Sequence, residues 1–440
     1  MIRILTDRTY RHLFVSQVVA LLGTGLATVA LGLLAYDIAG GDAGAVLGTA
    51  LAIKMVAYVG VAPVANAFAD RLPRRAMLVG LDLVRAAIAL CLPFVTEVWQ
   101  VYVLIFVLQA ASAAFTPTFQ ATIPDVLPDE KDYTKALSLS RLAYDLESLI
   151  SPALAAALLT VISFHGLFAG TAVGFLLSAA LVMSVVLPQS KAADEHRGLY
   201  DRMTKGLRIY LATPRLRGLL ALNLAVAAAG AMVIVNTVVY VRGRLGLGNT
   251  EVALALAAFG GGSMLAALLL PRLLDEVPDR AAMLTGAALL AVGLLLGLGM
   301  PGFGLLLPLW FALGLGYSLV QTPTGRLLRR SARAEDRPAL FAAQFALSHA
   351  CWLVTYPLAG WLGAEAGLVA PFAALGGLTA VAVASALWLW PTHDPETVVH
   401  LHADLDPDDP HVRDAERTPE GFRHAHTFII DAKHRRWSAH

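Results

Sequence analysis

Long apolar stretches, separated by short polar segments, run through most of this chain. A helix needs about 20 largely apolar residues to cross the hydrocarbon of a bilayer. Glycine and proline are tolerated inside such helices, because neighbouring helices satisfy the freed backbone groups. The pattern predicts twelve membrane-spanning helices, at residues 12–36, 45–67, 76–97, 99–122, 137–161, 165–187, 217–241, 250–271, 281–300, 303–323, 339–362 and 368–391.

The second half of the chain repeats the first in degraded form. Residues 63–80 and 269–286 align at an offset of 206, and offsets of 206 and 205 relate two further sites. These are Thr116-Pro117-Thr118 with Thr322-Pro323-Thr324, and Ser151-Pro152 with Tyr356-Pro357. Such a repeat predicts an all-α membrane protein whose twelve transmembrane helices form two pseudo-symmetric six-helix halves, the plan of many secondary transporters.

The polar segments divide the chain into four regions. We expect an N-terminal half at 1–187, a linker at 188–216, a C-terminal half at 217–391 and a polar tail at 392–440. The linker contains the stretch GLYDRMTKGLRIYLATP, whose spacing predicts an amphipathic surface helix.

Composition and charge placement agree with a multi-pass membrane protein. The chain is 57% hydrophobic and 15% charged, and its two cysteines lie inside apolar stretches, so no disulfide framework is indicated. Lysine and arginine gather before the first stretch, in the linker and in alternate loops, whereas the opposite loops hold only Arg242 and Arg244. The positive-inside rule therefore predicts that both termini are cytoplasmic.

A charged motif follows the second apolar stretch and reads Ala69-Asp70-Arg71-Leu72-Pro73-Arg74-Arg75. With the six-plus-six plan, this loop resembles the major facilitator superfamily over about residues 8–391. The chain has Asn66 and Pro73 where glycine is common in that family. The resemblance implies a conformational latch that holds the cytoplasmic ends of the halves together in the outward-facing state, made of Asp70, Arg71, Arg74 and Arg75.

Further motifs resemble one branch of this family. The fifth stretch has Ser151-Pro152 followed by alanines, similar to the antiporter motif with its glycines replaced. The segments 82–85 and 138–141 are similar to the drug:proton antiporters that include the enterobactin exporter, and the histidine-rich tail is similar to that of NreB-type nickel exporters. The resemblance implies a multi-pass protein of the bacterial inner membrane.

Several ionisable side chains fall inside the predicted membrane helices. Such groups are costly in a bilayer and are functional candidates by default. Asp82 and Arg85 are spaced i, i+3, and Arg141 and Asp145 are spaced i, i+4, so each pair can form on one helix face. Asp145 or Glu147 could carry the coupled proton, or the charges could form a structural cluster joining the third and fifth stretches. The candidates are Lys54, Asp82, Arg85, Arg141, Asp145 and Glu147.

Lys54 and four neutral side chains complete the intramembrane candidates. Lys54 could snorkel to the membrane surface or take part in a proton-coupled switch. His349 could be a proton-linked switch, one ligand of a metal, or a partner in an interhelical hydrogen bond. It cannot share a site with Cys351, because residues i and i+2 point about 200° apart on a helix. We expect the central cavity to be lined by Gln17, Asn223, Asn236 and His349.

The tail has the composition of a metal-binding segment. It holds eight of the twelve histidines, and His-x-His occurs twice. In an extended chain, residues i and i+2 lie on the same side, so both imidazoles of such a pair can reach one ion. We predict that Ni, Co or Zn is bound by His400, His402, His411, His424 and His426, while an acidic solvating tail is the alternative. Residues 426–431 alternate like a strand and suggest a small β-hairpin.

These patterns predict a proton-coupled exporter of a divalent transition-metal ion, with nickel or cobalt preferred. The alternatives are export of a drug, siderophore or other small organic solute, and a metal sensor or scaffold that transports nothing. The chain shows no phosphate-binding loop, catalytic triad or zinc-hydrolase motif, so we expect no enzyme activity and no cofactor beyond the tail's metal. Nothing in the sequence favours nucleic-acid binding, and the expected partners are the solute, protons and the lipid bilayer.

Overall fold

The computed structural model describes most of the membrane region and part of the tail. The described residues are 2–69, 73–187, 199–273, 276–333, 336–392, 394, 397–402, 409, 411–412, 415–427, 429–430, 434 and 437. Within the long helices, some side chains near 62–69 and along 117–149 are also outside the description.

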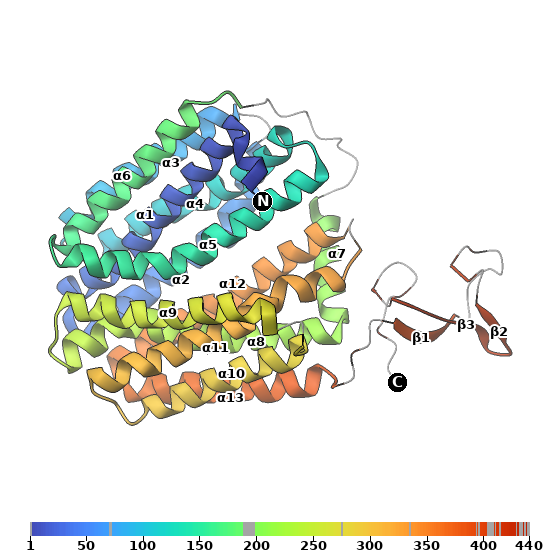
Figure 1. The fold of residues 1–440 in the computed structure, drawn as a ribbon. Helices are drawn as coiled ribbons and strands as arrows, with labels where there is room; N and C mark the ends of the chain where they lie inside the picture. Colours follow the sequence, from blue (N-terminus) through green and yellow to red (C-terminus); the bar gives the residue numbers. More distant parts are fainter. Residues whose placement is uncertain are drawn as a thin grey trace.

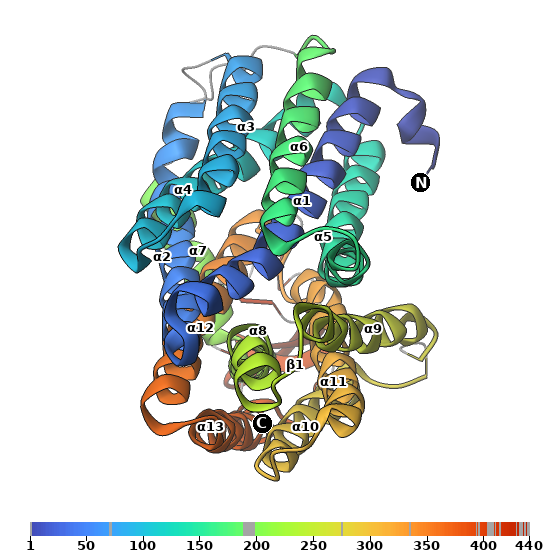
Figure 2. The same cartoon turned by 90° about the vertical axis from the view of Figure 1, so that its left-hand side faces the viewer.

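Twelve long helices form two groups of six, which confirms the all-α fold (Figures 1 and 2). The first group is α1 (Arg8–Ala39), α2 (Ala43–Ala69), α3 (Arg74–Cys91), α4 (Val98–Val126), α5 (Glu130–Leu159) and α6 (Phe164–Met183). The second is α8 (Pro214–Val238), α9 (Asn249–Leu273), α10 (Asp279–Gly297), α11 (Phe303–Arg330), α12 (Arg337–Ala366) and α13 (Val369–Leu389). Short 3-10 turns are η1 (Ile2–Thr6), η2 (Gly40–Asp42) and η3 (Leu92–Phe94), and a π-helical turn, η4 (Val239–Arg244), extends α8.

Most of these helices are long and apolar enough to cross a membrane. In the described chain, ten segments meet both criteria, and the first of them contains both α1 and α2. The described part of α5 contains a shorter apolar segment, Ile150–Leu159. Its remaining turns carry the charged residues that the sequence analysis singled out.

Several helices begin earlier than the apolar pattern predicted, because polar caps extend them. Asp7 precedes α1 and accepts a hydrogen bond from the backbone N–H of Tyr10 at 2.7 Å. Asp129 precedes α5 in the same way and accepts from the N–H of Asp132 at 3.0 Å. Helix α8 begins at Pro214, inside the predicted linker, because proline suits the first helical position.

The sequence repeat corresponds to equivalent places in the two halves. The related segments 63–80 and 269–286 cover the α2–α3 and α9–α10 connections. Arg75 donates to the carbonyl of Met183 at the end of α6, the last helix of the first half. Arg280 donates to the carbonyl of Trp390 at the end of α13, the last helix of the second half, at 2.9 Å. Both halves thus satisfy their final helix end with an arginine from the repeated loop.

The halves meet closely at the end of the molecule opposite the two termini. A Cβ on Gly48 of α2 would lie 2.5 Å from the carbonyl oxygen of Tyr356 on α12. A Cβ on Gly360 would lie 2.1 Å from the carbonyl oxygen of Gly44. Glycine is therefore required for α2 and α12 to approach each other here. Towards the termini, the ribbons of α5 and α12 diverge (Figure 1).

The linker contains the predicted amphipathic helix, α7 (Leu199–Ala212), which lies against the first turns of α12 (Figure 1). Lys205 pairs with Asp336. Tyr210 donates its hydroxyl hydrogen to Gln344 at 2.5 Å. Gly206 permits the contact, since a Cβ there would lie 2.1 Å from the carbonyl oxygen of Ala339. The linker helix is thereby attached to the second half.

The tail folds into a small antiparallel sheet beyond the end of the bundle (Figure 1). Its strands are β1 (Thr397–His402), β2 (Glu416–Thr418) and β3 (Gly421–Thr427), in the order β1-β3-β2. The predicted strand at 426–431 is wrong in position: β3 ends at Thr427, opposite Thr397 where β1 begins. Residues 429 and 430 lie outside any strand, whereas β2 and β3 form a small hairpin of the kind that the pattern suggested.

We predict that Gly48→Ala weakens the contact between α2 and α12. Overpacking of this kind costs about 1–3 kcal/mol, so the variant should have a lower thermal midpoint in detergent. Gly60→Ala is the matched control, because Gly60 lies on the same helix and no described atom is within 4 Å of the place its methyl group would take. Equal midpoints for Gly48→Ala and the unchanged protein would contradict the close-approach role.

Candidate functional site

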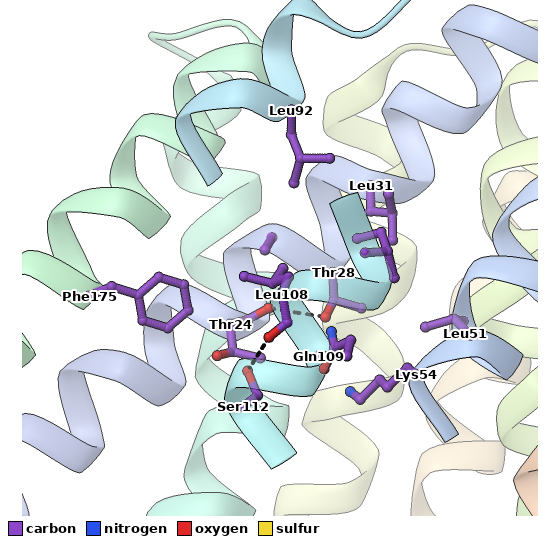
Figure 3. Close-up of a pocket in the computed structure, with 12 residues that line it drawn as sticks. Thr24, Thr28, Leu31, Leu51, Lys54, Leu92, Leu108, Gln109, Ser112 and Phe175 are labelled. Atoms are coloured by element: carbon purple, nitrogen blue, oxygen red, sulfur yellow. Dashed lines mark hydrogen bonds between the residues drawn. The ribbon is translucent and has the colours of Figure 1, made fainter. Parts of the chain in front are cut away.

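Lys54 lies beside an internal cavity of the first half (Figure 3). The cavity is bounded by α1, α2 and α4, which contribute Thr24, Thr28, Gln109 and Ser112 around the ammonium group. The Thr28 and Ser112 hydroxyls donate to backbone carbonyls of their own helices at 3.0 Å, so they are satisfied locally. The Lys54 side chain lines this interior space, which favours the expected switch over snorkelling to the membrane surface.

Glu147 on α5 is the acidic neighbour of Lys54. The two groups interact electrostatically, although they lie on different helices and far apart in sequence. Glu147 also packs against α1, since a Cβ on Gly25 would lie 2.7 Å from its Oε1 atom. A carboxylate and an ammonium group that interact between two helices can exchange partners when a proton arrives, which is the chemistry that proton coupling needs.

Asp82 and Arg85 form the ion pair that their spacing predicted. Asp82 is completely buried and also accepts a hydrogen bond from Ser178 of α6 at 2.7 Å. The Arg85 guanidinium lies between the rings of Phe115 on α4 and Phe175 on α6, at 4.1 and 4.5 Å from their centroids. The pair therefore joins α3 to α4 and α6, a structural role in which each charge faces an opposite charge or an aromatic ring.

The other predicted pair, Arg141 with Asp145, has side chains outside the described part of α5. The proposed link between the third and fifth stretches through these side chains remains a prediction.

Three of the polar cavity candidates are buried within the helix packing. Gln17 of α1 accepts a hydrogen bond from Ser140 of α5 at 2.9 Å. Asn236 of α8 donates to the carbonyl of Ala359 on α12 at 3.0 Å. Its Oδ1 atom lies 3.1 Å from the position of a Cβ on Gly44, so it forms part of the contact between the halves. Asn223 is 2% exposed. These positions indicate helix association for Gln17 and Asn236.

His349 lies at the interface of the two halves. Its ring stacks on that of Tyr58 from α2, with centroids 5.9 Å apart and planes 14° apart. Its Nδ1–H group donates a hydrogen bond to the carbonyl oxygen of Phe345 at 2.7 Å, so the Nε2 atom carries a lone pair. His349 also feels the charge of Lys54, so the intramembrane candidates of both halves are electrostatically connected.

The described part of the charged loop forms contacts inside the first half. Arg74 pairs with Asp125 at the end of α4, and Arg75 donates to the end of α6. The second half has a pair at the corresponding place with its charges exchanged, where Asp279 accepts from Arg326 at 2.9 Å. Asp70 and Arg71 lie outside the described residues, so the latch between the halves remains a prediction.

Four histidines of the tail, His400, His402, His411 and His434, bring their ring nitrogens together, and a fifth, His424, lies beside His400. His400 and His402 occupy one face of β1, and His424 lies opposite His400 on β3. His411 follows a turn in which its backbone N–H donates to Asp409 at 2.8 Å, and His434 comes from the last residues of the chain. The Nε2 atoms of His400 and His402 are 3.0 Å apart, and five further Nε2 pairs lie between 3.0 and 3.3 Å.

This arrangement suits a metal ion better than a hydrogen-bond network. The His400 Nδ1 atom is 3.0 Å from the Val398 carbonyl oxygen, so the proton sits on Nδ1 and Nε2 presents a lone pair. That one lone pair faces three other Nε2 atoms at 3.0–3.2 Å. It can accept only one N–H hydrogen, so the remaining contacts would bring lone pairs together. A cation at the centre satisfies all of these nitrogens at once.

The structure brings together four of the five predicted tail ligands. The side chain of His426 lies outside the described residues. His434 was missed because it stands alone in the sequence, without a second histidine two residues away. Only the general excess of histidine in the tail could have indicated it.

A buried ionic junction connects the tail with the second half, and the sequence analysis also missed it. Arg215, 2% exposed at the start of α8, donates to Asp394 at 2.9 Å and to Ser331 at the end of α11 at 2.8 Å. Arg330 pairs with Asp394 at 2.5 Å. The ring of Trp437, from the end of the tail, lies 4.9 Å from the Arg215 guanidinium carbon. Residues separated by more than 100 positions meet here, so local spacing gave no signal.

Among known proteins, the relatives of this chain are transporters. YfiS, an uncharacterized MFS-type transporter of Bacillus subtilis (strain 168), is 24% identical over 295 residues, covering 64% of this chain and 69% of YfiS. Macrolide efflux protein A of Enterococcus faecalis is 27% identical over 189 residues, covering 40% of this chain and 58% of that protein.

Solved structures agree on the fold. A bacterial homolog of the human lysosomal transporter Spinster, in an inward-facing and occupied conformation, superposes with a TM-score of 0.68 at 12% identity, covering 86% of this chain and 96% of that one. The nucleoside transporter NupG gives 0.65 at 12% identity, covering 87% and 98%. The family model of the Major Facilitator Superfamily matches residues 13–241 and 220–430. This chain therefore belongs to the Major Facilitator Superfamily of membrane transporters.

Proposed function

We propose that this transporter exports a divalent transition-metal ion, with Ni²⁺ or Co²⁺ preferred, in exchange for protons. The observation that carries the metal assignment is the convergence of five imidazoles in the tail. Imidazole nitrogen is a good ligand for these ions and a poor one for Mg²⁺ or Ca²⁺. The efflux direction is supported by the relative named as a macrolide efflux protein.

The tail captures the ion on the cytoplasmic side of a bacterial inner membrane. This orientation follows from the basic loops, which lie on the same side as both termini. The two halves then rock about their interface, so that the central cavity opens to one side at a time. The glycine contacts between α2 and α12 close the end of the cavity that faces away from the cytoplasm. In the outward-facing state, the loop at Asp70, Arg71, Arg74 and Arg75 holds the cytoplasmic ends of the two halves together.

Glu147 and Lys54 couple this swing to protons. While Glu147 is ionised, it attracts the Lys54 ammonium group across the N-terminal half. Protonation removes that attraction and frees Lys54 to interact with α4 or with His349 across the interface. The interhelical contact thus depends on the proton, as an exchanger requires.

Export of a small organic solute is the second candidate. The cavity beside Lys54 is lined by hydroxyl, amide and apolar side chains, which offer no anionic ligand to a bare divalent ion. Its one charge is positive and would repel such an ion. In this case, the tail would regulate the transporter and would not deliver its cargo.

Transport by inside-out vesicles under an imposed pH gradient separates these candidates. We expect gradient-dependent uptake of Ni²⁺ or Co²⁺, weakened in a chain that ends at Pro391 because tail capture is lost. Zn²⁺ and a cationic dye provide the comparison. Dye uptake without any metal uptake would refute the metal exporter and favour the organic solute.

Replacing Glu147 by glutamine removes the ionisable oxygen but keeps the shape of the side chain. We expect Glu147→Gln to insert normally and to lose the dependence of transport on the pH gradient. Glu365→Gln is the matched control, because Glu365 is exposed at the end of α12. If the Glu147 variant kept the original pH-gradient dependence, Glu147 would be a structural residue only.

Metal binding to the tail can be measured apart from transport. His402→Ala removes a nitrogen that lies 3.0–3.2 Å from three others, so we expect Ni²⁺ affinity to fall by at least about 10-fold in calorimetric titration of the full-length protein. His12→Ala is the control, since this histidine lies on α1 and bonds to the carbonyl of Arg8. Unchanged affinity in the His402 variant would rule out the cluster as the site.

A further inference from the structure

The imidazole rings of the tail form a square pyramid. The rings of His400, His424, His411 and His434 make a closed cycle whose neighbouring centroids are 4.7, 4.7, 4.9 and 4.8 Å apart. His400 and His411 face each other across this cycle at 6.5 Å, the diagonal expected of a square with such sides. His402 lies 4.8–5.2 Å from all four and forms the apex.

Four of these histidines offer ligand nitrogens that can share one ion. The ligand atoms of His400, His402, His411 and His434 all lie within 4.8 Å of one another, and five of their Nε2 separations are 3.0–3.3 Å. His424 lies beside this set, with its Nε2 atom 3.2 Å from that of His400. With metal–nitrogen bonds of about 2.1 Å, the ligands of one ion lie about 3.0–3.4 Å apart, so the set suits a transition-metal ion with affinity for imidazole, such as Ni²⁺ or Co²⁺.

His434 links this site to the membrane region. It is 4% exposed and lies three residues before Trp437, whose ring covers the guanidinium of Arg215. Three residues span at most about 11 Å, so an ion that holds His434 confines Trp437 to the surface beside Arg215. Trp437 also packs against the main apolar core of the bundle, which makes it an anchor for the tail.

Arg215 in turn holds three helix ends of the second half. Its partners are Ser331 after α11 and Asp394 after α13, and Asp394 also binds Arg330. An aromatic ring over the guanidinium attracts its charge and excludes water from the ion pairs, which strengthens them. Occupancy of the tail site is thus transmitted to the ends of α8, α11 and α13.

We propose that the tail binds one Ni²⁺ or Co²⁺ ion, and that this bound ion clamps Trp437 onto Arg215 and stiffens the second half at its tail-facing end. The ion acts here as a regulator that stays in the tail. The inference rests on the metal-binding part of the proposed function, but it does not require that the metal is the cargo.

The test uses the full-length protein in lipid nanodiscs with Co²⁺ as the probe. We expect one Co²⁺ ion to bind per protein molecule, and the binding to be lost when His402 is replaced by alanine. We also expect Co²⁺ to slow amide hydrogen exchange both in β1 and β3 and around Arg215. In Trp437→Ala, the strands should keep this protection, whereas the protection around Arg215 should be lost.

Trp388→Ala is the matched control, because Trp388 is a tryptophan of α13 that is 83% exposed. It should respond to Co²⁺ like the unchanged protein. Co²⁺ binding that survives His402→Ala would overturn the site, and equal protection around Arg215 with and without Trp437 would overturn the clamp. If the vesicles export metal but Trp437 does not affect protection around Arg215, the clamp is refuted and the proposed function is not. If Co²⁺ protects the region around Arg215 through Trp437 but no metal is exported, the proposed function is refuted and the clamp is not.

Discussion

The requirement that every polar group inside the bilayer finds a protein partner shapes this structure more than any other constraint. Hydrocarbon offers no hydrogen bonds, so an unpaired charge or backbone group there is costly. Asp82 and Arg85 form an ion pair with each other. Asp82 also accepts a hydrogen bond from Ser178, and Arg85 lies between two aromatic rings. Lys54 and Glu147 meet the requirement through an electrostatic interaction between two helices. Lys54 also faces the polar side chains that line the cavity.

The two halves meet this requirement by related means. Arg75 and Arg280 occupy corresponding loops, and each donates to the carbonyl end of its half's last helix. The neighbouring ion pairs, Arg74 with Asp125 and Asp279 with Arg326, serve the same junction with their charges exchanged. The two halves therefore keep the same contacts between helices, although the residues that make the ion pair differ. This difference is one reason why the two copies look dissimilar in the sequence.

Sequence reasoning succeeded where the relevant contact was local. Apolar length predicted the membrane helices, the i, i+3 spacing predicted the Asp82–Arg85 pair, and strand alternation placed His400 and His402 on one side. Spacing in the sequence could not identify partners that are distant along the chain. For Lys54, it left snorkelling and a proton-coupled switch open, because Glu147 lies on a different helix. His434 and the Arg215 junction were missed for the same reason. Of the expected strand at 426–431, only residues 426 and 427 belong to β3 among the described residues, and they pair with the start of β1.

The position of His434 close to the end of the chain has a practical consequence for handling this protein. A polyhistidine purification tag fused after His440 would begin within six residues of a nitrogen that points at the centre of the cluster. Its imidazoles would compete for the same ion and could displace Trp437 from Arg215. An N-terminal tag would leave the native ligand set intact, since η1 and α1 begin on a different part of the molecule (Figure 1).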